Sequence, residues 1–146
     1  MSLDFEGKVA IVTGSGGGIG KGYALELAKR GAKVVVNDLG GAVDGSGGSL
    51  SAAEAVVQEI ETAGGEAMAN GANVCSEEDV KNMVQATMEK WGRVDILINN
   101  AGILRDKSFA KMEWSDFVTV VNVHLMGSAL CALSLIHISE PTRLST

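Results

Sequence analysis

Three groups of residues have the types and spacing to hold a phosphorylated ligand, and the first is a run of glycines. Gly14, Gly18 and Gly20 lie in the segment TGSGGGIG, between an apolar run and a helical pattern. Glycines let a diphosphate approach main-chain N–H groups at the positive end of a helix dipole, where side chains would obstruct it. Because any tight strand-to-helix turn can carry glycines, the other two groups decide the interpretation.

The second and third groups are an acid and a polar tetrad, each directly after an apolar run. Asp38 lies 18 residues after Gly20. A carboxylate there can accept hydrogen bonds from ribose hydroxyls, and it favours NAD over NADP because a 2′-phosphate would meet a like charge. Residues 99–102 (NNAG) offer small and polar groups at the carboxyl end of a strand. Alternatively, Asp38 opens a loop and the two asparagines form a turn.

Alternating strand and helix patterns must position these residues. Short β-branched runs predict buried strands, and apolar residues at helical spacing predict the helices between them. Such alternation predicts one α/β domain, a Rossmann-like doubly wound parallel sheet of about four strands. The predicted strands are residues 8–13, 33–37, 66–69 and 94–98, and the predicted helices cover residues 19–30, 52–62, 76–91 and 117–125. In the first helix we expect Ile19, Tyr23, Ala24, Leu27 and Ala28 to form the apolar face.

Composition excludes several other classes of protein. The net charge of −6 provides no basic surface for nucleic acid, so we expect no nucleic-acid partner. The two cysteines, Cys75 and Cys131, make no disulfide framework, and with His124 and His137 they predict no metal site. The amino terminus lacks a secretory pattern, and we expect no apolar stretch of the ~20 residues that a membrane span needs.

The segment TGSGGGIG with Asp38 and NNAG resembles the short-chain dehydrogenase/reductases. The runs KVVVNDLGG and NNAGILRDKSFAKM and the glycine-rich residues 40–49 are more narrowly similar to the (3R)-hydroxyacyl-CoA dehydrogenase domains of type 2 peroxisomal multifunctional enzymes and bacterial relatives, over residues 3–130. The resemblance implies NAD as cofactor, a 3-hydroxyacyl-CoA-like substrate, a homodimer for the full-length protein, and a cytoplasmic or peroxisomal location. The implied cofactor contacts, with Val74 beneath the adenine, are Gly14, Ser15, Gly18, Ile19, Gly20, Asp38, Asn73, Val74, Asn100, Ala101 and Gly102.

The chain departs from that family pattern at its catalytic positions. The family's general base is a tyrosine followed four residues later by lysine, whereas the one tyrosine here, Tyr23, is followed by Leu27. We therefore assign no catalytic residue and expect this chain to be inactive alone. His124 replaces the family's usual asparagine, and it is interpreted as a core or interface histidine. Residues 1–130 are predicted to be a partial NAD-binding domain, and residues 131–146 a tail outside the family that resembles translated sequencing adapter.

Alternative functions remain at this point. The chain could be a nucleotide-binding fragment without catalysis, or part of a short-chain reductase acting on another carbonyl substrate. A P-loop would need glycine at Ser15 and a hydroxyl residue at Gly22, and a methyltransferase would carry an acid at Thr13. A cluster of loop cations offers either contacts for an anionic CoA tail or solvated charges: Arg105, Lys107 and Lys111.

Overall fold

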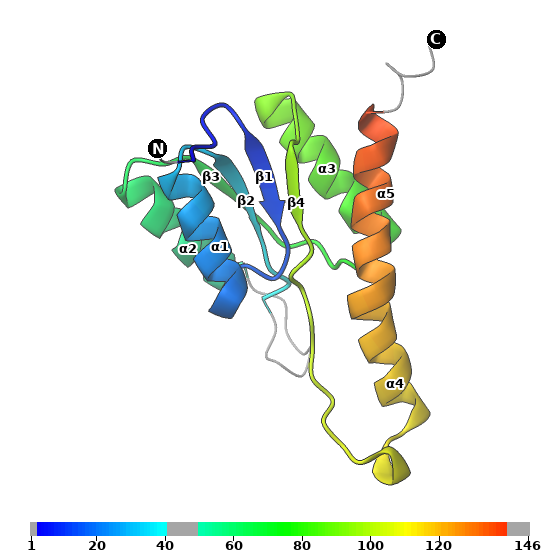
Figure 1. Ribbon diagram of the computed structural model, residues 1–146. Helices are drawn as coiled ribbons and strands as arrows, with labels where there is room; N and C mark the ends of the chain where they lie inside the picture. The colour runs from blue at the N-terminus through cyan, green and yellow to red at the C-terminus, as the bar shows by residue number, and fades with distance from the viewer. Residues whose placement is uncertain (1–2, 41–49, 140–146) are drawn as a thin grey trace.

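The computed structural model describes residues 3–40 and 50–139, which form a parallel sheet between two layers of helices (Figure 1). The strand order is β3-β2-β1-β4, so that β1 is central and β4 lies at one edge. The predicted Rossmann-like α/β class is confirmed. The glycine-rich segment predicted at residues 40–49 lies, apart from Gly40, outside the described residues. The strands are β1 (Val9–Val12), β2 (Lys33–Asn37), β3 (Ala67–Asn70) and β4 (Ile96–Ile98).

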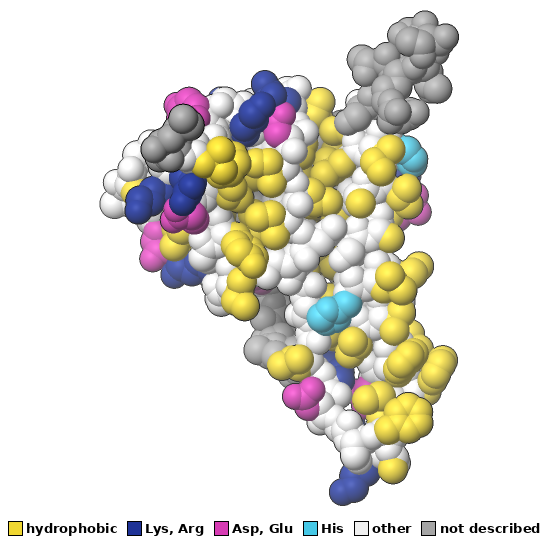
Figure 2. Space-filling model, viewed as in Figure 1, with side chains coloured by type: hydrophobic (Ala, Val, Ile, Leu, Met, Phe, Trp, Pro, Cys, Tyr) yellow, Lys and Arg dark blue, Asp and Glu magenta, His cyan; other side chains and the backbone are white. Residues whose placement is uncertain are grey.

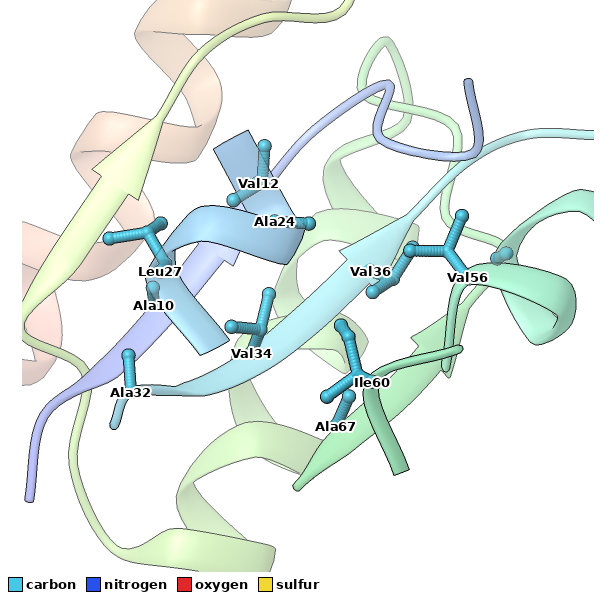
Figure 3. Packing of buried hydrophobic residues seen from close by; sticks show 11 residues of the cluster. Ala10, Val12, Ala24, Leu27, Ala32, Val34, Val36, Val56, Ile60 and Ala67 are labelled. Atoms are coloured by element: carbon cyan, nitrogen blue, oxygen red, sulfur yellow. The ribbon is translucent and has the colours of Figure 1, made fainter. Parts of the chain in front are cut away.

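Each central strand buries side chains on both faces of the sheet, as a parallel sheet covered by helices requires. Alternate residues point to opposite sides, so Val34 and Val36 enter one core cluster and Val35 enters the other. The first cluster is completed by α1 and α2 (Figure 3), and the second by α3 and α5. The helices that cover the sheet begin and end as follows: α1 (Gly18–Lys29), α2 (Ser51–Thr62), α3 (Glu77–Trp91) and α5 (Gly127–Ser139).

Small residues let α1 pack close to the sheet, and its buried face differs from the apolar face that was predicted. Gly20, Ala24 and Leu27 are the buried residues of α1. Ile19 is 72% exposed and Tyr23 is 45% exposed, so their predicted place on the apolar face is wrong. The physical reason is that Gly20 packs closely against the Gly14 carbonyl oxygen and the Asn100 side chain. The face of α1 that carries Gly20 is therefore buried, and Ile19 and Tyr23 lie toward solvent. Figure 1 shows α1 with its first turn beyond the carboxyl ends of the strands.

A helix cap fixes the start of α3. The hydroxyl of Ser76 accepts a hydrogen bond from the Asp79 main-chain N–H at 3.2 Å. The Asp79 carboxylate does not return the bond to Ser76 as a full capping box would; it accepts the main-chain N–H of Asn73 at 3.0 Å. The cap therefore also holds the segment that connects β3 to α3.

The predicted helix at residues 117–125 is part of a much longer helical segment. A short 3₁₀ helix, η1 (Phe109–Lys111), precedes α4 (Trp114–Val121), and a π-helical turn, η2 (Asn122–Met126), joins α4 to α5. Because these pieces continue into one another, residues 114–138 form one apolar helix that is long enough to cross a membrane by length and composition. The expectation that no stretch reaches this length is therefore wrong. Only 11% of the apolar window of this helix is buried in the structure, and Figure 2 shows hydrophobic side chains gathered on the surface over α4 and α5.

Candidate functional site

The amino terminus of α1 lies open at the carboxyl edge of the sheet. Gly18, its first residue, has φ of +56°, a conformation that favours glycine. Gly17 before it has no side chain to cap the helix. A Cβ atom added at Gly17 or Gly18 would meet no atom within 4 Å. The start of α1 is thus uncapped by a side chain and has open space beside Gly17 and Gly18, which is an arrangement suited to an anion.

The two flanking glycines of the motif serve a different purpose. A Cβ atom on Gly14 would come within 2.8 Å of the Ala101 Cα, and one on Gly20 would come within 2.5 Å of the Gly14 carbonyl oxygen. The Gly20 Cβ would also collide with the Asn100 side chain. Gly14 and Gly20 are therefore required because the chain's own segment 100–101 fills the space beside them. Contact of these two glycines with a cofactor stays a prediction.

A network centred on Thr13 joins the loop after β1 to the loop after β4. The buried Thr13 hydroxyl accepts the main-chain N–H groups of Asn100 and Ala101 at 3.1 and 3.0 Å. The Asn100 side-chain amide donates to the carbonyl oxygens of Thr13 and Gly14 at 3.1 and 3.0 Å. Sequence reasoning did not identify Thr13 as an organiser of the site; the only signal was a hydroxyl residue at the end of an apolar strand.

Asp38 lies between the glycine loop and the loop after β2. Its Oδ2 accepts the Gly16 N–H at 2.9 Å, and its Oδ1 accepts the Gly40 N–H at 2.8 Å. A Cβ atom on Gly16 would approach Oδ2 to 2.6 Å, so Gly16 must lack a side chain for this contact to form. The residue is partly buried. Asp38 thereby holds two main-chain segments at the same edge as the open end of α1.

Two asparagines, Asn37 at the end of β2 and Asn70 at the end of β3, shape the same edge of the sheet. Asn37 is buried, and its amide donates to the Asn70 side chain at 3.1 Å and to the Ala72 carbonyl oxygen at 3.0 Å. These bonds shape the turn that leads to Asn73 and Val74. The Asn73 side chain accepts the Cys75 N–H at 2.9 Å, and Val74 is buried against Gly127 of α5. Both residues lie in the chain segment that follows β3.

The remaining predicted site residues differ in exposure. Ser15 is fully buried, and its hydroxyl donates to the Val12 carbonyl oxygen at 2.7 Å, so its side chain serves the protein's own backbone. Ile19 is largely exposed beside the open helix end. Gly102 contacts the ring of His124, which is exposed, so the interpretation of His124 as a core residue is wrong. In residues 3–40 and 50–139 no three His, Cys, Asp or Glu side chains gather to hold a metal ion.

Two of the cations in the loop after β4 are paired with one acid of the same chain. Asp116 accepts from Lys107 at 2.9 Å and lies 3.6 Å from Arg105. The hydrogen bond from Lys107 lowers the pKa of the Asp116 carboxyl, and the same pair raises the pKa of Lys107. Of the three cations, Arg105 and Lys107 are thus paired with an acid, while Lys111 is exposed. The alternative of a contact with a CoA tail stays a prediction.

Comparison with known proteins gives consistent results. The short chain dehydrogenase family model matches residues 8–138. The peroxisomal multifunctional enzyme A of Dictyostelium discoideum is 60% identical over 128 residues, which is 88% of this chain and 28% of that protein. A short chain dehydrogenase from Mycobacterium avium superposes with a TM-score of 0.86 at 43% identity, over 96% of this chain and 50% of the other.

A third similar protein is a 7α-hydroxysteroid dehydrogenase complexed with NADH and 7-oxo glycochenodeoxycholic acid. It has a TM-score of 0.80 and 35% identity, over 90% of this chain and 48% of that protein. This chain spans about half the length of the two solved structures and less than a third of the multifunctional relative. The family model covers most of the sequence with the motifs in their expected places on the sheet. The chain belongs to the short-chain dehydrogenase family.

Proposed function

We propose that this edge of the sheet binds NAD, and that the protein acts in NAD-dependent oxidation of a secondary alcohol, most simply a 3-hydroxyacyl-CoA. The observation that carries the proposal is the open amino terminus of α1 beside Asp38. The open space at Gly17 and Gly18 fits a diphosphate, because main-chain N–H groups and the helix dipole both favour an anion there. A bound nicotinamide would accept or donate the hydride.

Asp38 supports the choice of NAD over NADP. A carboxylate has about four acceptor positions, and Gly16 and Gly40 occupy two of them. Counting only residues 3–40 and 50–139, two acceptor positions are left for the hydroxyls of a ribose. A 2′-phosphate at the same place would be repelled by the carboxylate charge. The main-chain bonds to Asp38 hold that carboxylate in place before any ligand arrives.

The other predicted contacts extend along the same edge. Residues 100–102 would form the wall beside the nicotinamide, since Thr13 holds this segment against the glycine loop. Asn73 and Val74 would lie by the adenine, and Ile19 would cover the diphosphate with its exposed side chain. Gly14, Ser15 and Gly20 would act mainly by shaping the loop. No catalytic acid or base is assigned, because Tyr23 has no lysine four residues later.

The substrate proposal rests on the relatives. The multifunctional enzyme of Dictyostelium is peroxisomal by name, and the 7α-hydroxysteroid dehydrogenase acts by name on a secondary hydroxyl group. A soluble cytoplasmic or peroxisomal enzyme and a homodimer are consistent with these names and with the family resemblance. A domain boundary near residue 130 stays a prediction; α5 continues past it, and Cys131 is buried in the second core cluster. By itself, this chain is expected to bind the cofactor without turning it over.

Calorimetry with NADH, NADPH and S-adenosylmethionine tests the proposal. We expect binding of NADH and none of S-adenosylmethionine. The Asp38→Ala variant should bind NADH about tenfold or more weakly, since a hydrogen bond to a charged group contributes ~1.5–3 kcal/mol, and it should lose less affinity for NADPH. Glu61→Gln, at the far end of α2, removes an exposed charge and is the control. Equal losses for both cofactors would show that the carboxylate does not contact the ribose.

A further inference from the structure

The π-helical turn η2 places the ring of His124 against the loop that follows β4. A Cβ atom on Gly102 would lie 2.6 Å from the His124 Cε1, so the ring covers the Gly102 backbone closely. The ring Nε2 lies 3.1 Å from the Ile103 main-chain nitrogen and 3.0 Å from the Ile103 carbonyl oxygen. One side-chain nitrogen thus contacts both polar groups of a single residue. This contact closes one end of segment 100–102.

A second contact closes the other end of that segment. The Asn99 side-chain amide donates to the Ser128 carbonyl oxygen at 3.3 Å. The Ser128 hydroxyl in turn donates to the His124 carbonyl oxygen at 2.6 Å, across the π-helical turn. The helix therefore holds residues 99 and 103, and between them lie the residues whose N–H groups bind Thr13. We call the contacts of His124 with Ile103 and of Asn99 with Ser128 the helix–loop tether.

The chemistry of imidazole decides which bond to Ile103 forms. A neutral ring nitrogen is either a donor or an acceptor, so Nε2 can serve only one of the two Ile103 groups. Main-chain N–H groups without a partner are rarer than main-chain carbonyl oxygens without a partner. The tautomer with its proton on Nδ1 is therefore favoured, because its Nε2 accepts the Ile103 N–H. A glutamine reaches about as far as Nε2 and offers both a donor and an acceptor.

We propose that His124 is a positioning residue for the cofactor: it fixes Ile103 and thereby holds residues 100–102 where the nicotinamide would lie. This inference rests on the proposed function of the site. It assigns His124 no contact with the reacting atoms. Its action runs through the main chain, from the ring to Ile103 and from there to the segment that binds Thr13.

The test compares His124→Gln with His124→Phe, which keeps a ring over Gly102 and removes the hydrogen bond. His137→Phe, at an exposed position of α5, is the matched control. Amide hydrogen exchange at Ile103, followed by NMR, should be about fivefold faster in His124→Phe, the factor for one net hydrogen bond. His124→Gln and His137→Phe should exchange as the parent does. The dissociation constant for NADH should rise by a similar factor in His124→Phe and return nearly to the parent value in His124→Gln.

Two results would overturn the proposal. Unchanged Ile103 exchange in His124→Phe would show that the ring does not hold this N–H group. Faster exchange with an unchanged dissociation constant for NADH would show that the tether has no part in cofactor positioning. If the parent protein binds no NADH, the proposed function fails instead, and the exchange rates still report whether the tether exists. The two failures are therefore distinguishable.

Discussion

Two glycines of α1 provide a sharp test of how the glycine motif works. Gly20 and Gly22 belong to the same helix, and replacing either by alanine should stabilise the helix itself by ~0.5–1 kcal/mol. A Cβ atom on Gly22 would meet nothing within 4 Å. One on Gly20 would lie 2.5 Å from the Gly14 carbonyl oxygen and would displace the Asn100 side chain. The two variants therefore differ mainly in that collision.

The structure gives the size of the expected difference. Displacing Asn100 removes its amide bonds to the Thr13 and Gly14 carbonyl oxygens, at ~0.5–1.5 kcal/mol each, and overpacking costs ~1–3 kcal/mol. After the helix gain is subtracted, Gly20→Ala should lower the free energy of unfolding by about 3 kcal/mol. Gly22→Ala should raise it by ~0.5–1 kcal/mol. The melting temperatures should then differ by about 10 °C in a chain of this size.

Urea unfolding of the two variants and the parent measures both effects. The urea concentration at the midpoint of unfolding should fall for Gly20→Ala and rise for Gly22→Ala. The dependence of the free energy of unfolding on urea concentration should stay the same. If both variants shift in the same direction by similar amounts, segment 100–101 does not pack against Gly20 and the reasoning is refuted. A fall confined to Gly20→Ala, together with weaker NADH binding, would support both the packing and the proposed site.

Two further predictions concern the bonds that join β1 to β4. Thr13→Val leaves the N–H groups of Asn100 and Ala101 without an acceptor and should lower the free energy of unfolding by ~2–4 kcal/mol. Thr13→Ser keeps the hydroxyl and should retain most of the parent's stability. Equal losses for the two variants in urea unfolding would contradict this reasoning. The hydrogen bond from Arg93, together with that from the Val9 N–H, lowers the pKa of Asp95 in the folded protein. The ionised Asp95 therefore stabilises the fold at pH values above its unfolded pKa. This stabilisation is lost as the pH falls through the lowered folded pKa. Acidification should therefore destabilise the parent more steeply than Asp95→Asn, and equal slopes would count against it.

Much of the fold could be predicted because the sequence pattern is strong where burial is complete. The run of residues 33–37 is buried on both faces, so continuous β-branched residues mark it clearly, and β2 matches the prediction in full. Asp38 and residues 99–102 were predicted at the sheet edge because parallel strands end on the same side. The structure brings both to the edge where α1 begins.

Contacts between distant segments leave no local pattern in a sequence, and this limited the prediction of the site. Helical spacing places Ile19 and Tyr23 on an apolar face, but the close approach of Gly20 to Asn100 decides which face is buried. A similar limit applies to Thr13, whose two acceptor bonds depend on a strand more than 80 residues later. The continuous helix at residues 114–138 was missed because the prediction stopped at residue 125 and residues 131–146 were interpreted as a tail outside the family.

The position of β4 beside β1 has a consequence for how the site forms during folding. The carboxylate of Asp95 accepts the Val9 N–H across a separation of 86 residues, and among the described strands β4 pairs with β1 alone. Contacts between residues so far apart in the sequence form late in folding. The chain loses conformational entropy when the loop closes, before the new contacts stabilise it. Since residues 100–102 follow β4, the proposed nucleotide site is complete only after β4 docks. A nucleotide present during refolding would accordingly bind and stabilise those molecules in which β4 has paired with β1.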